Sequence, residues 1–441
     1  MQKKFENKVE VVKYRVLREL ARAIWEDHDP FTVFNDIASK VVKKGEPPMS
    51  CCVYKDRAIV AERMRMGIGD YHGHNDTIQV VDIACDECPK AGYMVTDLCR
   101  GCLAHSCREA CPRDAIAIDE RGHSHIDKTR CVECGRCAQS CKYGAIFNLQ
   151  RPCEKVCPTG AIHMAETGEA VVDQEKCIVC GLCVYECPFG APNDISAVVK
   201  VIRQIKSRDG RKVYAVVAPS VAAQFPDGTT EQVYAGIKAL GFDEVVEVAM
   251  GADETARTEA AELLEKGFLT TSCCPAFVEY IHIKFPELEQ YVSHTLSPMA
   301  YTGKAIKAKE YIDHVLTFFE LQALFDSKDI VLSELEGLDL QDGSSYGRAY
   351  CRSGGVAASV VQAIKELGRE DFEVKAVVCN GIDECKAALM KAKAGKLDGN
   401  IIEGMCCPGG CIKGNGTLVN KKNTDKFINE YAASAEKQTI L

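Results

Sequence analysis

The chain of 441 residues carries a formal net charge of −9, and 46% of its residues are hydrophobic. This length predicts about two to four domains, and the acidic balance argues against a nucleic-acid partner. No apolar run reaches the roughly 18 residues that a membrane-spanning helix needs. We therefore expect a globular protein that binds neither nucleic acid nor membrane.

Twenty-six cysteines are the most unusual feature of the composition. The N-terminus, residues 1–17, is charged and amphipathic, and it lacks the apolar centre and the small-residue cleavage site of a signal peptide. So many cysteines in a chain without an export signal indicate metal ligation rather than disulfides. The predicted location is therefore a reducing cytoplasm.

Residues 1–84 are expected to form a helical N-terminal segment. Apolar residues recur at roughly helical spacing from Val9 to Trp25, which predicts a helix there. Cys51 and Cys52 follow in the same segment. We expect both to be small buried residues, because free cysteine packs like a small hydrophobic side chain.

A cysteine run occurs twice in residues 85–195. The pattern Cys-x2-Cys-x2-Cys-x3-Cys begins at Cys131 and again at Cys177, and Pro188 follows the second copy. This is the run of bacterial ferredoxins, in which three closely spaced thiolates bind one 4Fe-4S cluster and the fourth cysteine reaches a neighbouring cluster. Zinc ribbons use separate Cys-x2-Cys pairs instead. The repeat therefore predicts ferredoxin-like cluster domains.

The cysteines from Cys85 to Cys187 number sixteen, as four 4Fe-4S clusters require. The crossed ferredoxin pattern assigns three sites, and the remaining cysteines make the fourth by elimination. The first to fourth sites, in that order, are expected to be Cys99, Cys102, Cys107 and Cys141; Cys111, Cys131, Cys134 and Cys137; Cys157, Cys177, Cys180 and Cys183; and Cys85, Cys88, Cys153 and Cys187. His105, in the long gap after Cys102, is an alternative ligand at the first site.

The sequence pattern changes at about residue 196. Helical patterns at 230–241 and 320–325 alternate with four predicted buried strands at 213–220, 244–250, 268–272 and 374–380. Such alternation indicates an α/β core whose loops at the strand ends hold a cofactor. Residues 207–212 are the expected linker to this core, which would occupy 196–441. The predicted fold class is therefore α+β ferredoxin-like cluster domains followed by an α/β core.

Three short segments of the core carry cysteines or turn residues at predicted strand ends. They are residues 271–275 (TSCCP), 405–411 (MCCPGGC) and 218–220 (APS). Glycines in such turns let the backbone approach an inorganic cluster closely. Cys274, Cys407 and Cys411 together offer three ligands to one further cluster.

In these segments the chain resembles the iron–iron (FeFe) hydrogenases, of the monomeric type with N-terminal ferredoxin-like domains, over about residues 85–441. The resemblance implies an α/β hydrogenase catalytic core. Its active centre would be a 4Fe-4S cubane bridged by one cysteine to a di-iron unit carrying CO, cyanide and a dithiolate amine. Cys274 and Cys407 would ligate the cubane, and Cys411 would bridge to the di-iron unit. The residues expected beside that unit and its ligands are Pro219, Ser220, Ser297 and Met405.

The resemblance also implies a proton path through Cys273, Glu259, Ser293 and Glu262. Glu259 and Glu262 lie three residues apart on a helical pattern and so share a face. A solvated helix face is the simpler interpretation of that pair taken alone. A thiol has a reference pKa of about 8.5 that its surroundings can tune toward neutrality, which suits proton relay by Cys273.

One departure from the family pattern concerns the cubane. The family has a further loop with a Pro-Cys-x-x-Lys motif, which supplies the fourth cysteine and a lysine that holds a cyanide. No such motif lies between Lys307 and Tyr311, where the pattern places it. The cysteines that could substitute are Cys351, Cys379, Cys385 and Cys406.

The resemblance thus implies an oxygen-sensitive hydrogenase that interconverts dihydrogen with protons and electrons. A ferredoxin-like carrier would exchange electrons through the 4Fe-4S clusters, and hydrogenase maturation proteins would supply the di-iron unit. Two alternatives remain: a hydrogen-sensing or regulatory member of the same fold, and a polyferredoxin-like electron-transfer protein without an active centre.

Overall fold

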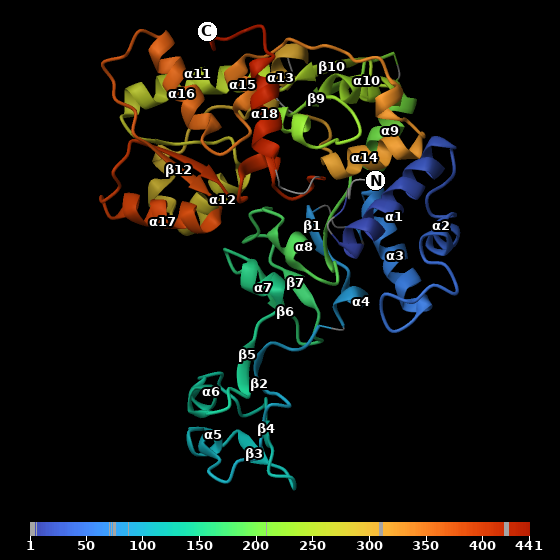
Figure 1. The fold of residues 1–441 in the computed structure, drawn as a ribbon, viewed down its shortest axis with the longest axis vertical. Coiled ribbons are helices and arrows are strands. Elements are labelled where there is room, and N and C mark those ends of the chain that lie inside the picture. Colours follow the sequence, from blue (N-terminus) through green and yellow to red (C-terminus); the bar gives the residue numbers. More distant parts are fainter. Residues whose placement is uncertain are drawn as a thin grey trace.

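The computed structural model describes residues 5, 7–69, 71, 73, 76–86, 88–208, 210–307, 312–418 and 423–441. Figure 1 shows three parts: N-terminal helices, an α/β core beside them, and a stalk of short strands and helices that projects from both. None of the helices in these ranges is long and apolar enough to cross a membrane.

The predicted N-terminal helix is confirmed as α1, Lys8–Trp25, and it packs with α2, Phe34–Val41, and α3, Val53–Ile68. Asn7 begins α1, because its side chain accepts a hydrogen bond from the amide of Glu10. The apolar face of α1 is buried in a cluster that also includes residues of α3 and of the core helix α14, Phe318–Ser327. The N-terminal helices are therefore anchored to the core.

The expectation that Cys51 and Cys52 are both buried is wrong. They lie in the turn that begins α3, where Cys51 is exposed and Cys52 is partly exposed. This turn is held by polar contacts, since the carboxylate of Asp56 accepts hydrogen bonds from the amides of Met49 and Ser50.

The cysteine repeats form short antiparallel strand pairs with single-turn helices between them. The pairs are β3 (Ile116–Ile118) with β4 (Ser124–Ile126), β2 (Gly92–Val95) with β5 (Ile146–Leu149), β6 (Ile162–Met164) with β7 (Ala170–Val172), and β1 (Ile78–Val80) with β8 (Pro192–Asp194). The short helices are α4 (Asp82–Cys85), α5 (Ser106–Glu109), α6 (Arg136–Ser140), α7 (Pro152–Val156) and α8 (Leu182–Glu186). Because β1 pairs with β8, both ends of the repeat region lie side by side next to the core (Figure 1).

The core contains parallel strands, as the alternating pattern predicts. β9 (Tyr214–Val217) pairs with β10 (Glu244–Glu247), and β13 (Ile401–Met405) lies between β11 (Leu269–Thr270) and β12 (Ala376–Asn380). The four predicted strands are present but shorter than expected, and residues 249–250 belong to helix α11 rather than to β10. Strand β13 was not predicted, because Glu403 and Gly404 interrupt its apolar run.

Helices surround these strands. The longer ones are α9 (Val198–Lys206), α10 (Thr230–Leu240), α11 (Ala249–Lys266), α12 (Pro275–Lys284), α13 (Pro298–Lys307), α16 (Gly355–Glu366), α17 (Ile382–Lys393) and α18 (Thr424–Ala433). The short ones are α15 (Ser345–Ala349), η1 (Pro219–Ala223), η2 (Pro286–Tyr291), η3 (Leu332–Glu334) and η4 (Gly410–Ile412). Capping boxes begin α10, at Thr229 and Gln232, and α14, at Thr317 and Glu320, so local sequence sets where these helices start.

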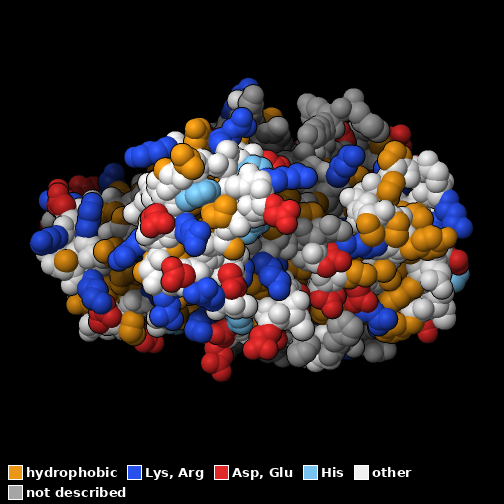
Figure 2. All heavy atoms as spheres, turned by 90° about the horizontal axis from the view of Figure 1, so that it is seen from below, with side chains coloured by type: hydrophobic (Ala, Val, Ile, Leu, Met, Phe, Trp, Pro, Cys, Tyr) orange, Lys and Arg blue, Asp and Glu red, His pale blue; other side chains and the backbone are white. Residues whose placement is uncertain are grey.

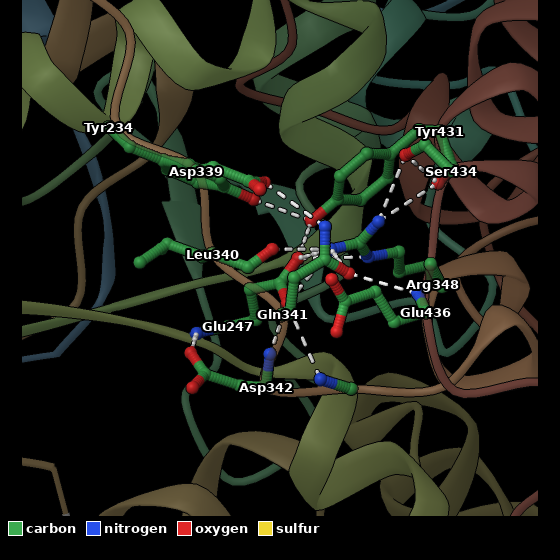
Figure 3. A network of polar contacts seen from close by, with 12 residues as sticks. Tyr234, Glu247, Asp339, Leu340, Gln341, Asp342, Arg348, Tyr431, Ser434 and Glu436 are labelled. Carbon is green, nitrogen blue, oxygen red and sulfur yellow. Dashed lines mark hydrogen bonds and ion pairs between the residues drawn. The ribbon is translucent and has the colours of Figure 1, made fainter.

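A buried polar network ties β10 to α15 and α18 (Figure 3). Arg348 and Glu247 are both 1% exposed and form an ion pair at 3.0 Å. The hydroxyl of Tyr431 donates to Glu247 and is within hydrogen-bond distance of Tyr234, at 2.6 Å. Arg348 also donates to the carbonyl of Leu340 at 2.6 Å. The network holds the C-terminal helix against the elements that follow β10.

Candidate metal centre

The second and third predicted cluster sites each surround one pocket. Cys111, Cys131, Cys134 and Cys137 line the first of these pockets, and Cys157, Cys177, Cys180 and Cys183 line the other. Both loops use left-handed backbone at equivalent positions, with φ of 53° at Glu133 and Val179. A β-branched residue such as Val179 rarely adopts this conformation, and strain of this kind is typical of ligand-binding loops.

Two of the four thiols predicted for the first site, Cys99 and Cys107, lie at Ser124. The Ser124 hydroxyl lies 3.2 Å from Cys107 Sγ. Although burial opposes the shift, hydrogen bonds from Ser124 and the Gly101 amide lower the pKa of Cys99. Cys141 Sγ accepts a hydrogen bond from the amide of Ala145 at 3.4 Å. Cys102, the remaining predicted ligand, is exposed.

The fourth site, assigned by elimination, also consists of neighbouring thiols. Burial and, after it, the charges of Cys187, Cys85 and Cys88 together raise the pKa of Cys153 to about 12. Cys85 Sγ accepts hydrogen bonds from Arg151 Nη1 at 3.6 Å and from the amide of Ala170 at 3.4 Å. Among the described residues, no group of three or more metal-ligating side chains converges as for a single metal ion. The ligand assignments of the four sites stay predictions.

Cys274, Cys407 and Cys411 lie on the loops after β11 and β13, at the carboxyl ends of parallel strands, where α/β sheets hold cofactors. The charges of Cys274 and Cys407 both act on Cys411. Glycine is needed around them: a Cβ on Gly414 would lie 3.2 Å from Cys407 Sγ, and one on Gly410 would lie 2.7 Å from Met405 Sδ. The three thiols and this open loop fit three ligands of a cubane.

Adjacent cysteines on the first of these loops differ in proton affinity. A hydrogen bond with the thiol of Cys406 lowers the pKa of Cys274 to about 7, which favours the thiolate that binds metal. Burial raises the pKa of Cys273 well above its usual range. Cys411 is exposed where it lines a cavity, but desolvation by the surrounding protein and the charges of Cys274 and Cys407 raise its pKa to about 12, so metal binding would have to displace this proton.

Three of the residues predicted beside the di-iron unit lie in two different places: Pro219 and Ser220 near Cys411, and Met405 near Cys273. Pro219 and Ser220 form part of η1, which packs on η4 next to Cys411; Gln224 joins the two by donating to the carbonyls of Ser220 and Ile412. A cavity of about 340 Å³ opens beside Cys411. Met405 is 3% exposed and shares an apolar cluster with Cys273.

Ser297 has a local role in the structure. Its hydroxyl accepts a hydrogen bond from the amide of Ala300 at 3.4 Å, and its carbonyl accepts one from Tyr301 at 3.0 Å. It therefore caps the start of α13.

The predicted proton-path residues run from the interior to the surface. Glu259 on α11 is fully buried, and burial raises its pKa to about 8. Its carboxylate accepts hydrogen bonds from the amide of Ser272 at 3.1 Å and from the hydroxyl of Tyr350 at 3.4 Å. Ser293 is 5% exposed. Glu262 is nearer the surface, where it accepts from the amide of His294 at 3.2 Å.

Sequence analysis missed two buried groups beside this path. The charges of Glu259, Cys273 and Glu403 all raise the pKa of Tyr350, after burial as the largest cause. Glu403 is fully buried on β13, and its oxygens accept from the amides of Gly354 at 2.7 Å and Ala357 at 2.8 Å. No motif marks either residue, although a glutamate within an otherwise apolar segment is a usable sign of a buried carboxylate.

The fourth cubane ligand is the open question of this site. The loop position, residues 308–311, lies outside the described residues. Two of the possible substitutes adjoin the three thiols: the Cys411 amide donates to the carbonyl of Cys351 at 3.1 Å, and Cys406 bonds Cys274. The thiol of Cys385 forms hydrogen bonds with those of Cys406 and Cys379. Cys385 and Cys379 are therefore farther from the three thiols than Cys406 is.

The third cluster site adjoins the core centre. The charge of Cys407 is among the causes, after burial, that raise the pKa of Cys180 to about 11. A Cβ added to Gly181 would come within 2.4 Å of Asn415, which follows Cys411 in the chain. Lys284 of α12 donates to the carbonyl of Thr159 at 3.1 Å. Stalk and core are therefore in contact where their cysteines are closest.

Two protein families match the chain, one over the core and the other over the cysteine repeats. The family described as "Iron only hydrogenase large subunit, C-terminal domain" matches residues 211–311 and 308–415. The "4Fe-4S dicluster domain" matches residues 98–145 and 151–191. The two hydrogenase segments overlap at residues 308–311, the position where the family pattern places the Pro-Cys-x-x-Lys motif.

Individual relatives are similar at modest identity. Iron hydrogenase 1 of Clostridium pasteurianum is 27% identical over 398 residues, covering 71% of this chain and 69% of that protein. The periplasmic Fe hydrogenase large subunit of Nitratidesulfovibrio vulgaris is 29% identical over 379 residues, covering 67% and 86%. A solved FeFe-hydrogenase variant from Chlamydomonas reinhardtii is 21% identical, covers 55% of this chain and 90% of that chain, and has a TM-score of 0.42.

Proposed function

The chain belongs to the iron-only hydrogenase family, and we propose that it interconverts dihydrogen with protons and electrons. The observation that carries the proposal is the meeting of Cys274, Cys407 and Cys411 beside the third cluster site. When bound, the di-iron unit would supply the metal site at which dihydrogen is formed or split. The protein would supply its thiol ligands, a route for protons and a route for electrons.

Protons would move between the centre and solvent through side chains of α11 and the loops beside it. Cys273 would hold a proton on its thiol, and its raised pKa keeps that proton bound at neutral pH. Glu259, with a pKa of about 8, would exchange protons with Cys273 near neutral pH, where general acid–base groups are most effective. Ser293 and Glu262 would carry the proton to the surface near His294.

Electrons would travel along the four clusters of residues 85–195 to or from the catalytic domain, residues 196–441. The helical segment, residues 1–84, would precede the cluster domains in the chain. An external ferredoxin-like carrier would dock at the end of the stalk, where Cys102 and Cys134 are exposed and Leu103 is 97% exposed. Figure 2 shows acidic and basic side chains interspersed on the face seen from that end. We place the protein in the cytoplasm, where thiols stay reduced, with maturation proteins supplying the di-iron unit.

The test is assembly of the centre in the full-length chain. After reconstitution of the clusters and loading of the di-iron unit, infrared spectra should show CO and cyanide stretching bands, and dihydrogen turnover should follow. Cys411→Ser should abolish or severely weaken the bands. Bands with slow turnover would favour the sensor. Complete absence of bands in the intact protein would leave an electron carrier.

A further inference from the structure

Three cationic side chains gather around the fourth cluster site, the cysteines Cys85, Cys88, Cys153 and Cys187. Lys13 comes from α1, Arg63 from α3 and Arg151 from the residue before α7. They belong to segments far apart in the sequence, and α3 lies beside α4, which ends in Cys85 (Figure 1).

Arg151 is 2% exposed and contacts the site directly. Its Nη1 donates to Cys85 Sγ at 3.6 Å, and its Nη2 donates to the carbonyls of Cys88 at 3.1 Å and Gly168 at 2.6 Å. In the described part of the chain, no other accessory cysteine has its sulfur hydrogen-bonded by a lysine or arginine. The fourth site therefore differs from the others in having a cationic hydrogen-bond donor on one of its sulfurs.

Arg63 lies near Cys187, the last cysteine of this site. It is 8% exposed, its Nη2 donates to the carbonyls of Phe189 and Gly190, and its Nε is buried without a hydrogen-bond partner. The approach depends on a glycine, because a Cβ on Gly190 would lie 2.8 Å from Arg63 Nη2. Arg63 also lines a cavity of about 110 Å³ together with Lys13 and Cys187.

The three cations have no full counter-charge of their own. Within the described ranges, none of them forms an ion pair with a carboxylate, although the charges of Asp194 and Glu10 act on Lys13, that of Asp56 acts on Arg63, and Glu169 interacts with Arg151. Burial lowers the pKa of Lys13 to about 8 and that of Arg63 to about 10. Buried charge is costly unless it is compensated, and four cysteine thiolates would bring negative charge to their centre.

The stalk places this site between the others. β2 follows Cys88 and β5 precedes Cys153, so this strand pair leads to the first and second sites. On its other side, Cys153 is a neighbour of Cys183 in the third site, which adjoins the core. An electron passing between the stalk end and the core would therefore pass the fourth site.

We propose that Lys13, Arg63 and Arg151 make the cluster of the fourth site the most easily reduced of the four accessory clusters, so that it stores one electron between the stalk end and the core. The inference rests on the proposed electron route. A cluster's reduction potential depends on its charge, on hydrogen bonds to its sulfurs and on its exposure. The reduced cluster carries one more electron than the oxidised one, so added positive charge stabilises the reduced form. That electron comes from a neighbouring cluster or from a one-electron donor.

The experiment is a potentiometric titration of the full-length chain with its accessory clusters and without the di-iron unit, followed by electron paramagnetic resonance. One cluster should be reduced at a higher potential than the other three, and Cys153→Ser should remove that component. Lys13→Met, Arg63→Met and Arg151→Met should each weaken electron binding by that cluster alone, by about tenfold, or about 59 mV for one electron.

The matched control is Arg65→Met on the same helix α3. Arg65 pairs with Glu62, and among the described residues no hydrogen bond joins it to a cysteine, so this variant should leave all four potentials unchanged. If Arg151→Met loses the cluster, Lys13→Met and Arg63→Met still decide the question. Unchanged potentials in both, or equal shifts in several clusters, would overturn the proposal. Because the titration uses no dihydrogen, its outcome does not depend on whether the protein has hydrogenase activity.

Discussion

Cys273 and Cys274 follow the same strand, yet their surroundings favour opposite protonation states. Neighbouring side chains in an extended segment point to opposite sides. Cys274 meets the thiol of Cys406, which stabilises its thiolate, whereas Cys273 packs with Met405 and Tyr350, where burial favours the neutral thiol. One thiol is thus suited to metal ligation and the other to holding a proton.

Removal of the Cys273 thiol should separate these roles. Cys273→Ala should leave iron content and the infrared bands nearly intact, while turnover falls towards the upper end of the roughly 100- to 10,000-fold range of general acid–base groups. Cys274→Ala is the contrasting variant and should lose the cubane. Loss of iron from Cys273→Ala would mean that the two cysteines are assigned the wrong way round.

Glu259 should also make the stability of the folded chain depend on pH. Its pKa rises from 4.5 to about 8 in the folded chain, because it is buried. Below pH 4.5 the carboxyl is protonated in both states and its contribution is fully present. Above pH 4.5 the unfolded chain loses this proton, whereas the folded chain keeps it up to about pH 8, because releasing it would leave a buried charge. The free energy of unfolding therefore falls as pH rises through this range.

Glu259→Gln should therefore flatten the decline of stability between pH 5 and pH 9. The difference from the unaltered chain should reach roughly 3–5 kcal/mol, at 1.36 kcal/mol per pKa unit. Thermal midpoints measured without oxygen at both pH values would show it. Glu254→Gln, an exposed position on the same helix paired with Arg257, should keep the original slope; an unchanged slope in Glu259→Gln as well would contradict the raised pKa.

Among the elements, the cysteine loops were the most predictable from sequence, because ligand spacing alone constrains them. The repeat at Cys131 and Cys177 has the same left-handed positions in both copies. Strand β13 was harder to predict: Glu403 can be buried there because the distant amides of Gly354 and Ala357, at the start of α16, donate hydrogen bonds to its carboxyl oxygens, and one sequence does not reveal such partners. Tyr350 beside Glu259 was missed for the same reason.

The Arg348–Glu247 network offers a test at the scale of elements. Arg348→Met should lower the free energy of unfolding by about 3–5 kcal/mol, because Glu247 would remain buried without its partner. Arg369→Met, which breaks an exposed pair with Asp371, should lower the free energy of unfolding far less, because water screens this pair. Thermal or denaturant midpoints of both variants make the comparison, and similar losses would show that the network does not depend on its buried charges.

For the whole molecule, the number of clusters is the first quantity to establish. Four sites predict about sixteen irons in residues 85–187, measured on this segment after reconstitution. Cys153→Ser should remove one cluster and leave three. A plateau at about eight or twelve irons in the unaltered segment would contradict the fourth site.

The contact between stalk and core gives the last prediction. Cys180 of the third site lies next to Cys407, so electrons should reach the core through this site. Cys180→Ser should remove the third cluster and reduce turnover with any external electron carrier by orders of magnitude. Exchange of deuterium between dihydrogen and water needs no external electrons and should persist, because the core centre and the proton path through Cys273 and Glu259 are untouched.

The matched variant is Cys134→Ser, which should remove a cluster near the exposed end of the stalk. It should slow turnover with a protein carrier but leave turnover with a small dye largely intact, since the third and fourth sites remain available. If Cys180→Ser also abolishes isotope exchange, its cluster is needed to build the core centre. If it keeps full turnover with the dye, electrons enter the core by a route that bypasses the stalk, and the order of sites along the molecule does not set the path of the electrons.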